Sequence, residues 1–344
     1  MPDEETLHPR SAGPGARTLA GRAARAVLDP SPAAMRNLAL AGVICTAGII
    51  ATGAAVRLSE SGLGCPDWPQ CTRGSLVAAH TAGDPMFHTW IEFGNRLVTV
   101  AITLIALVVF VAAWRFRPGG RRRRDLVWLA AVQPAGIVAQ ALLGGIVVLT
   151  NLNPGMVALH FLVSIAVLAA AVALHVRCTE GQEPARPLAR TDLRLLAYAV
   201  LAAVALMLAA GTVVTGTGPL AGAGAVPRFH LPLAGATQFH ADIGWLLGGL
   251  ALPLAVGLWL TGASRRAVRL GWALLAMIGL QGAIGYTQYF TGLPAGLVWL
   301  HVCGSTLIWI LALRLVFALR DRGGVVTGTG QPGAPAAAEP AAAR

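Results

Sequence analysis

The sequence predicts an all-α integral membrane protein with eight transmembrane helices. Of its 344 residues, 56% are hydrophobic and only 12% are charged, and the mean hydropathy is +0.66. Soluble domains carry about 25% charged residues, so a water-soluble enzyme is excluded. A bilayer-spanning helix needs about 20 apolar residues. Eight such stretches occur, near residues 37–57, 89–114, 126–149, 156–176, 193–215, 237–260, 270–290 and 296–318.

These stretches are expected to be helices, because lipid offers the backbone no hydrogen-bond partners. A β-barrel would instead show alternating segments of about 10 residues. The arginines then orient the helices. The net charge is +11, and 22 of the 26 basic residues fall on one side of the predicted membrane. Cytoplasmic loops are rich in basic residues, so we expect a multi-pass protein of the bacterial cell membrane with both termini in the cytoplasm.

The exceptions to this distribution are Arg57, Arg73, Arg96 and Arg228. A strongly basic chain can also indicate a nucleic-acid partner. Because topology accounts for nearly all of the arginines, we expect no nucleic-acid partner.

The chain contains an internal repeat, which predicts two four-helix halves. The residues that match at an offset of 141 include Gln140, Gly144, Thr150, Leu152 and His160 with Gln281, Gly285, Thr291, Leu293 and His301. A weaker match pairs Gly53 with Gly211. Each half has an even number of spans, so both copies insert the same way up. We therefore expect two four-helix bundles related by a pseudo-twofold axis along the membrane normal.

The predicted segments follow from this division. They are a cytoplasmic N-terminal tail over 1–35, a first half over 36–176, a cytoplasmic linker over 177–192, a second half over 193–318 and a disordered cytoplasmic tail over 319–344. The last segment is rich in Gly, Ala and Pro, a composition that is typical of disorder.

Two histidines of the second half are candidate metal ligands. His240 and His301 lie near the starts of the sixth and eighth spans, at similar depth near the outer face. Ionisable residues inside a membrane are costly and are often functional. Paired histidines on facing helices suit axial ligation of a haem iron. The alternative is a pair that is hydrogen-bonded within the helix packing, but the matched depth on repeat-related helices favours ligation.

The first half has the same frame with different residues. His160 is the counterpart of His301, whereas the counterpart of His240 falls near Asn95. Asparagine is a poor iron ligand. One half could therefore hold a saturated, electron-carrying haem, and the other a haem with weaker or single ligation that is open to reaction.

Glu92 is peculiar to the first half, since the repeat has Thr237 near its position. It shares a helix face with His88, Asn95 and Arg96. Two alternatives remain open. Either Glu92 and Arg96 neutralise each other as a buried pair, or Glu92 serves as a proton donor or base while Arg96 holds a haem propionate.

Cys65 and Cys71 lie in the predicted outer loop 58–88, in a compartment that permits disulfides. The short segment between them favours a disulfide over two free thiols, and a zinc site would lack further ligands beyond His80. The disulfide could be a structural clasp or could pass electrons.

The segment VRLSESGLGCPDWPQC, residues 56–71, resembles the first outer loop of the haem A synthase family. EFGNR at 92–96, ALHF at 158–161 and the surroundings of His240 and His301 are similar to the family's other motifs. The resemblance covers about residues 36–318. The lack of lysine and the excess of Ala, Gly and Arg suggest an actinobacterial type.

The resemblance implies a membrane oxidoreductase that serves cytochrome c oxidase assembly. It would oxidise the C8 methyl of haem O to the formyl group of haem A by successive hydroxylations. Carried onto this sequence, His240 and His301 would hold the iron of a haem b cofactor. His160 would bind the substrate haem, with Arg96 beside it, and Glu92 would be catalytic.

Other parts of the family pattern are carried over in the same way. Cys65 and Cys71 would be its cysteine pair. Asn95 departs from the pattern, because much of the family has a histidine there. Either His88 takes that place at the substrate haem, or the iron stays five-coordinate.

The expected partners are haem O, the haem O synthase, an electron donor that the sequence does not name, membrane lipid and a second copy of the chain in a homo-oligomer. Two other functions compete with the synthase. A membrane cytochrome b that only relays electrons needs His240 and His301 but gives Glu92 no role. A transporter built on a parallel repeat would place its site at the midplane, whereas these polar residues lie near the outer ends of the spans.

Overall fold

The computed structural model describes residues 19–72, 74–78 and 86–325. Within these residues, eight helices are long and apolar enough to cross a membrane, which confirms the predicted number of spans. The spans are α2 (Pro32–Leu58), α3 (Met86–Arg115), α4 (Arg124–Leu149), α5 (Pro154–Arg177), α6 (Thr191–Thr217), α7 (Leu233–Leu260), α8 (Arg265–Phe290) and α9 (Ala295–Ala318). Each lies within a few residues of its predicted stretch. Pro134 in α4 and Pro253 in α7 are tolerated inside their helices.

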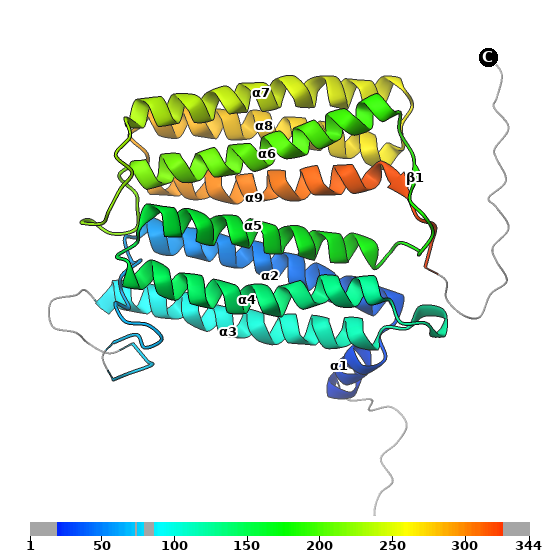
Figure 1. Ribbon diagram of the computed structural model, residues 1–344, viewed down its shortest axis with the longest axis horizontal. Helices are drawn as coiled ribbons and strands as arrows, with labels where there is room; N and C mark the ends of the chain where they lie inside the picture. The colour runs from blue at the N-terminus through cyan, green and yellow to red at the C-terminus, as the bar shows by residue number, and fades with distance from the viewer. Residues whose placement is uncertain (1–18, 73, 79–85, 326–344) are drawn as a thin grey trace, which may run out of the picture.

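The eight helices contact one another in two groups, which Figure 1 shows one above the other. Helices α2 to α5 contact each other in chain order, and α2 also contacts α5; helices α6 to α9 repeat this pattern, with α6 contacting α9. The groups meet where α9 packs against α2 and α5, and where α5 packs against α6. Trp309 in α9 spans this boundary, since its Nε1 donates to the Ile165 carbonyl oxygen of α5 at 3.1 Å. The twofold relation between the groups stays a prediction.

One turn is built twice. The turn between α4 and α5 holds Asn151 and Leu152 at φ values of 51° and 56°, and the turn between α8 and α9 holds Gly292 and Leu293 at 79° and 60°. A leucine with positive φ is uncommon. In both turns the leucine N–H donates to the carbonyl oxygen five residues earlier, at 2.8 and 2.7 Å. The sequence repeat therefore corresponds to a repeated backbone conformation.

The helices carry large apolar side chains on their outer surface. Trp128, Trp245 and Phe290 are among the exposed ones. An apolar surface of this extent would promote aggregation in water but suits contact with lipid. The protein is therefore a multi-pass membrane protein. The side of the membrane that its termini face stays a prediction.

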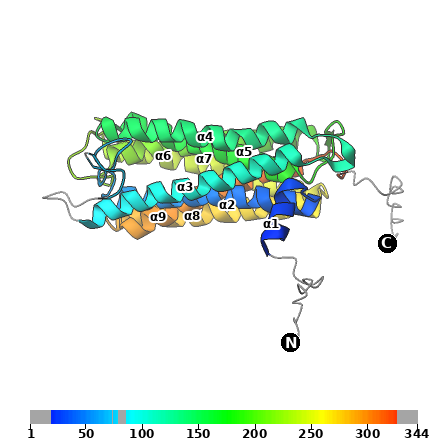
Figure 2. The ribbon, with the colours of Figure 1, turned by 90° about the horizontal axis from the view of Figure 1, so that it is seen from below.

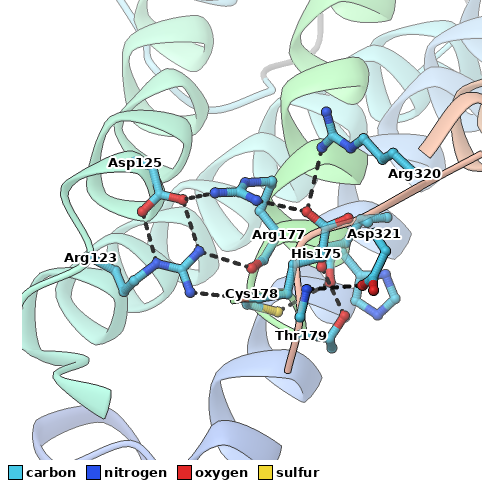
Figure 3. A network of polar contacts seen from close by, with 11 residues as sticks. Arg123, Asp125, His175, Arg177, Cys178, Thr179, Arg320 and Asp321 are labelled. Atoms are coloured by element: carbon cyan, nitrogen blue, oxygen red, sulfur yellow. Dashed lines mark hydrogen bonds and ion pairs between the residues drawn. The ribbon is translucent and has the colours of Figure 1, made fainter. Parts of the chain in front are cut away.

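The arginine-rich end of the bundle, here the inner end, contains a buried polar network (Figure 3). Arg123 is 1% exposed. It donates to both carboxylate oxygens of Asp125, at 2.9 and 2.8 Å, and to the carbonyl oxygens of Glu180 and Arg177, at 2.7 and 3.2 Å. Arg177 in turn contacts the carboxylates of Asp125 and Glu180 at 2.6 and 2.7 Å. Arg123, expected only to orient the helices, thus also joins α4 to the end of α5.

Two segments predicted as tails contain ordered elements. In the N-terminal segment, α1 (Leu19–Leu28) contacts α2 and α3. Beyond α9, β2 (Arg320–Asp321) pairs antiparallel with β1 (Arg186–Pro187) of the linker. Figures 1 and 2 show α1 and this strand pair at the same end of the helices.

The predicted start of disorder at residue 319 is therefore corrected. Arg320 also contacts the Glu180 carboxylate at 3.4 Å, and the chain is described as far as Val325. Pairing between segments that are far apart in the sequence leaves no trace in local composition. The rest of the predicted tail, 326–344, lies outside the described residues.

Candidate functional site

Three histidines near the outer end of the bundle each pack against a glycine of a neighbouring helix. The pairs are His160 with Gly144, His240 with Gly211 and His301 with Gly285. A Cβ added at the glycine would lie 3.4, 3.2 and 3.3 Å, respectively, from the imidazole Cε1. Any side chain there would press on the ring, so glycine lets each imidazole lie directly on the neighbouring backbone. The repeat identified these glycines in the sequence, but not their contact with the histidines.

In the second half, the repeat-related histidines face each other. The ring centroids of His240 and His301 lie 6.3 Å apart, with the ring planes inclined by 64°. A metal–imidazole bond is about 2 Å long, so two imidazoles that share one metal ion have centres about 6 Å apart. The distance thus suits two axial ligands of one iron.

The hydrogen bonding of these rings agrees with an external ligand. The Nδ1 atoms of His240 and His301 are buried and make no hydrogen bond of normal geometry, although the Met207 carbonyl lies near the His240 ring. Buried polar atoms normally have partners. A carbonyl that accepts from one ring nitrogen would leave the other ring nitrogen free for a metal. The residues present therefore fit a haem.

In the first half, the position opposite His160 has no histidine. The Nδ1 atom of His160 is likewise buried without a hydrogen bond. On α3, the Asn95 side-chain oxygen accepts a hydrogen bond from the Thr52 hydroxyl of α2 at 2.8 Å. The adjacent Gly53, the repeat counterpart of Gly211, would have nothing within 4 Å of an added Cβ. Three of the four repeat-related positions thus hold a histidine–glycine pair, and the fourth holds Asn95 beside an open Gly53.

Glu92 and Arg96 are brought together, but both also bind the outer loop. Glu92 is 7% exposed, and its Oε1 contacts the Arg96 guanidinium at 2.8 Å. Its Oε2 accepts from the Cys65 N–H at 2.7 Å. Arg96 donates to the carbonyl oxygens of Cys65 and Gln70 at 3.1 and 2.9 Å, and to that of Asp67 at 3.4 Å. The structure therefore has the ion pair, with Glu92 buried and Arg96 partly exposed, and a haem propionate would have to compete with the loop carbonyls for Arg96.

The predicted disulfide between Cys65 and Cys71 is confirmed. Its loop, residues 59–72, packs on the outer end of the first half. The Trp68 ring lies so close to Gly145 of α4 that no Cβ would fit there. The Gly62 N–H donates to the Gly222 carbonyl oxygen at 3.1 Å, which links this loop to the outer loop of the second half.

His88 serves this loop rather than the position of Asn95. Its Nδ1 lies 2.9 Å from the Ser61 hydroxyl. It precedes Asn95 by seven residues, which places it about 10 Å further along the helix. His80, the other histidine considered near the loop, lies outside the described residues.

A hydrogen bond joins the two candidate sites. Trp299 lies two residues before His301, and its Nε1 donates to the Ala51 carbonyl oxygen at 2.9 Å. Ala51 immediately precedes Thr52 on α2. The histidine-bearing part of α9 is therefore in direct contact with the part of α2 that faces Asn95.

The chain matches the COX15-CtaA family model, described as cytochrome oxidase assembly protein, over residues 36–313. A haem A synthase from Halalkalibacterium halodurans is 27% identical over 272 residues, which are 75% of this chain and 86% of the relative. One from Lysinibacillus sphaericus is 35% identical over 141 residues, 41% of this chain and 43% of the relative. One from Geobacillus thermodenitrificans is 30% identical over 106 residues, 30% of each chain.

The matched region thus spans less than half the length of two of these relatives and most of the third. All three organisms are Firmicutes, so the actinobacterial type stays a prediction.

Proposed function

The chain belongs to the COX15-CtaA family of cytochrome oxidase assembly proteins, and on that premise we propose that it is a membrane oxidoreductase that converts haem O to haem A. The observation that carries this proposal is the contrast between the halves. His240 and His301 lie 6.3 Å apart in the second half. The positions that the repeat makes equivalent in the first half hold His160 and Asn95, and a buried acid, Glu92, lies three residues before Asn95 on α3. A resident cofactor and a reacting substrate need these different surroundings.

In this proposal, His240 and His301 hold the iron of a haem b cofactor. That haem, when bound, supplies electrons one at a time. His160 holds the substrate haem O. The hydrogen bond from Trp299 to the Ala51 carbonyl oxygen links α9 to α2, and with them the two proposed sites.

Glu92 is the proposed catalytic residue. Its carboxylate accepts from the Cys65 N–H and pairs with Arg96. A proton taken up by Glu92 would remove its negative charge and weaken the ion pair with Arg96. Proton uptake at Glu92 and loosening of the 59–72 loop would therefore accompany each other. A catalytic acid or base typically contributes about 10²–10⁴-fold to a rate.

Haem extraction tests the proposed function. The chain is expressed beside a source of haem O, and the extracted haems are separated by chromatography. Accumulation of haem A is expected, and a cytochrome b that only relays electrons would yield none. His175→Ala is a matched control, because His175 lies in α5 with His160 but near the inner end. It should leave haem A formation intact, whereas His160→Ala should abolish it.

The remaining partners follow from the chemistry of the substrate. Haem O is apolar and stays in the membrane, so direct transfer from a haem O synthase is the proposed supply route. The electron donor and a homo-oligomeric state remain predictions. Co-purification with a tagged haem O synthase tests the first of these contacts.

A further inference from the structure

We propose that the first half holds its haem through a single axial ligand, His160, and that Asn95 and Thr52 leave the opposite face of the iron without a protein ligand. This inference rests on the proposed function and specifies the substrate site. It predicts that the substrate iron, unlike that of the cofactor, is open to a small external ligand.

In the second half, the His240 ring packs directly against Gly211. A Cβ added at Gly211 would lie 3.2 Å from the Cε1 atom of that ring. Its counterpart Gly53 faces open space within the same limit of 4 Å. The backbone position that would receive a second imidazole is thus present in the first half, but no ring occupies it.

The Asn95 side chain already has a hydrogen-bond partner. Its oxygen accepts a hydrogen bond from the Thr52 hydroxyl at 2.8 Å. The repeat has Ala210 at the position of Thr52 and His240 at that of Asn95. The first half therefore has a hydrogen-bonded Thr–Asn pair where the second half has Ala and His. Amide oxygen is a hard ligand that suits magnesium and calcium better than haem iron, and here it already has a partner.

His88, Glu92 and His175 are other described side chains that could be considered as ligands of the same iron. The Nδ1 of His88 contacts Ser61 at 2.9 Å, about two helical turns from Asn95. Glu92 is bound to Cys65 and Arg96. His175 follows His160 by fifteen residues on α5, about 22 Å along the helix. His88, Glu92 and His175 are thus not candidates for a second ligand to an iron bound to His160.

Carbon monoxide is a direct probe of this open face. Protein produced with haem O is reduced and exposed to carbon monoxide, and the difference spectrum is recorded. We expect the wild type to bind the gas at one haem, and His160→Ala to lose that signal. Asn95→His should lower the binding by about tenfold or more, because a tethered imidazole competes at millimolar effective concentration. Electron paramagnetic resonance of the oxidised Asn95→His protein, without carbon monoxide, should then report a low-spin ferric iron.

A mirror variant keeps the test independent of how Asn95→His folds. His240→Asn, alone or with Ala210→Thr, should open the cofactor iron to carbon monoxide. His80 lies outside the described residues. The variant His80→Ala tests it as a ligand and should bind carbon monoxide as the wild type does. A wild-type first-half haem that is low-spin and inert to the gas would overturn the inference. So would unaltered binding in Asn95→His, or a signal that His80→Ala increases.

Chromatography of the same samples reports on the proposed function separately. Haem O or haem A retained in a His160-dependent manner supports that function, whatever the response to carbon monoxide. If carbon monoxide binds at a His160-dependent haem that is neither O nor A, the ligation inference stands and the proposed function fails. If no haem depends on His160, both are wrong.

Discussion

The two halves of the bundle share a frame but use their outer polar residues differently. In the second half, His240 and His301 face each other and pack against Gly211 and Gly285 of neighbouring helices. In the first half, Glu92 and Arg96 bind the disulfide loop, and Asn95 binds Thr52, so His160 stands alone. The backbone features, glycine contacts and turns with positive φ, are common to both halves. The two halves therefore share backbone features but differ in the side chains around them.

The largest expected effect is on the histidine pair. His240→Ala or His301→Ala removes a ligand, and haem retention in the second half should fall by at least about 100-fold, more than the loss of a contact to a ligand would cause. Absorption spectra of purified protein measure this. His160→Ala should leave the second-half spectrum as it is. An unaltered spectrum in both second-half variants would remove these residues from ligation.

The next effect separates the two roles of Glu92. Glu92→Gln keeps an acceptor for the Cys65 N–H but cannot take up a proton. Haem A formation should fall by about 10²–10⁴-fold while the second-half haem stays in place. Extracted haems should stop at haem O or an alcohol intermediate.

Arg96→Gln is the matched control, because it weakens the same loop but leaves the acid. Equal losses in the Glu92 and Arg96 variants would assign Glu92 to loop packing alone. Full activity of Glu92→Gln would exclude it from the mechanism.

The inner end offers a third contrast. Arg123 is buried among Asp125, Arg177 and Glu180, whereas the repeat has Ser264 at its position. Arg123→Gln removes charge-assisted hydrogen bonds to three partners in this network, while Asp125 keeps Arg177 as a partner. Arg123→Gln should therefore lower the thermal unfolding temperature in detergent clearly. The exposed neighbour Arg124, changed in the same way, should have little effect. Equal shifts of the unfolding temperature in the two variants would show that the loss of a positive charge lowers stability, whether or not the arginine belongs to the network.

A smaller effect tests the glycine contacts. Gly211→Ala should displace the His240 ring by a few tenths of an ångström and weaken haem retention by about 10–100-fold, the range of an outer-shell change. Gly53→Ala, at the matched open position, should leave the spectra of both haems unchanged. If the two variants behave alike, the contrast between the halves at these positions is wrong.

The smallest effect concerns Cys178, which follows α5 at the inner end. Burial raises the pKa of its thiol to about 12, against about 8.5 for a free cysteine. The folded state keeps a proton that the unfolded chain releases, so Cys178 should lower stability as pH rises from about 9 to 12. At pH 8 the thiol should resist maleimide in the native protein. Arg123→Gln, which loosens this region, should speed the labelling. Rapid labelling of the native wild type would contradict the burial.

Much of the fold could be predicted because each span is local. A run of apolar residues needs no distant partner to become a helix in lipid, so all eight spans appeared in the sequence. The repeat likewise identified Gly144 and Gly285. Non-local contacts had no such signal. The pairing of Arg320–Asp321 with Arg186–Pro187 joins segments more than 130 residues apart, and apolar periodicity says nothing about it.

For the candidate site, residue types were predictable and their partners were not. The sequence pointed to His160, His240, His301, Glu92, Arg96 and the cysteine pair, because ionisable groups in spans are few and costly. It left open whether Glu92 and Arg96 face a cavity or each other. The sequence singled out Gly211 only through a weak repeat. The structure explains why a glycine is present there, because the His240 ring packs against it.

By itself, the sequence determined the membrane class, the number of spans, the internal repeat and the set of ionisable groups, because hydropathy and residue identity can be read one helix at a time. Only the tertiary structure decided which of those groups meet. It placed His240 6.3 Å from His301, turned Arg96 toward the carbonyls of the disulfide loop and paired Asn95 with Thr52. The physical reason is that a hydrogen bond or a shared ligand depends on the packing angle and register of separate helices, which no single helix encodes.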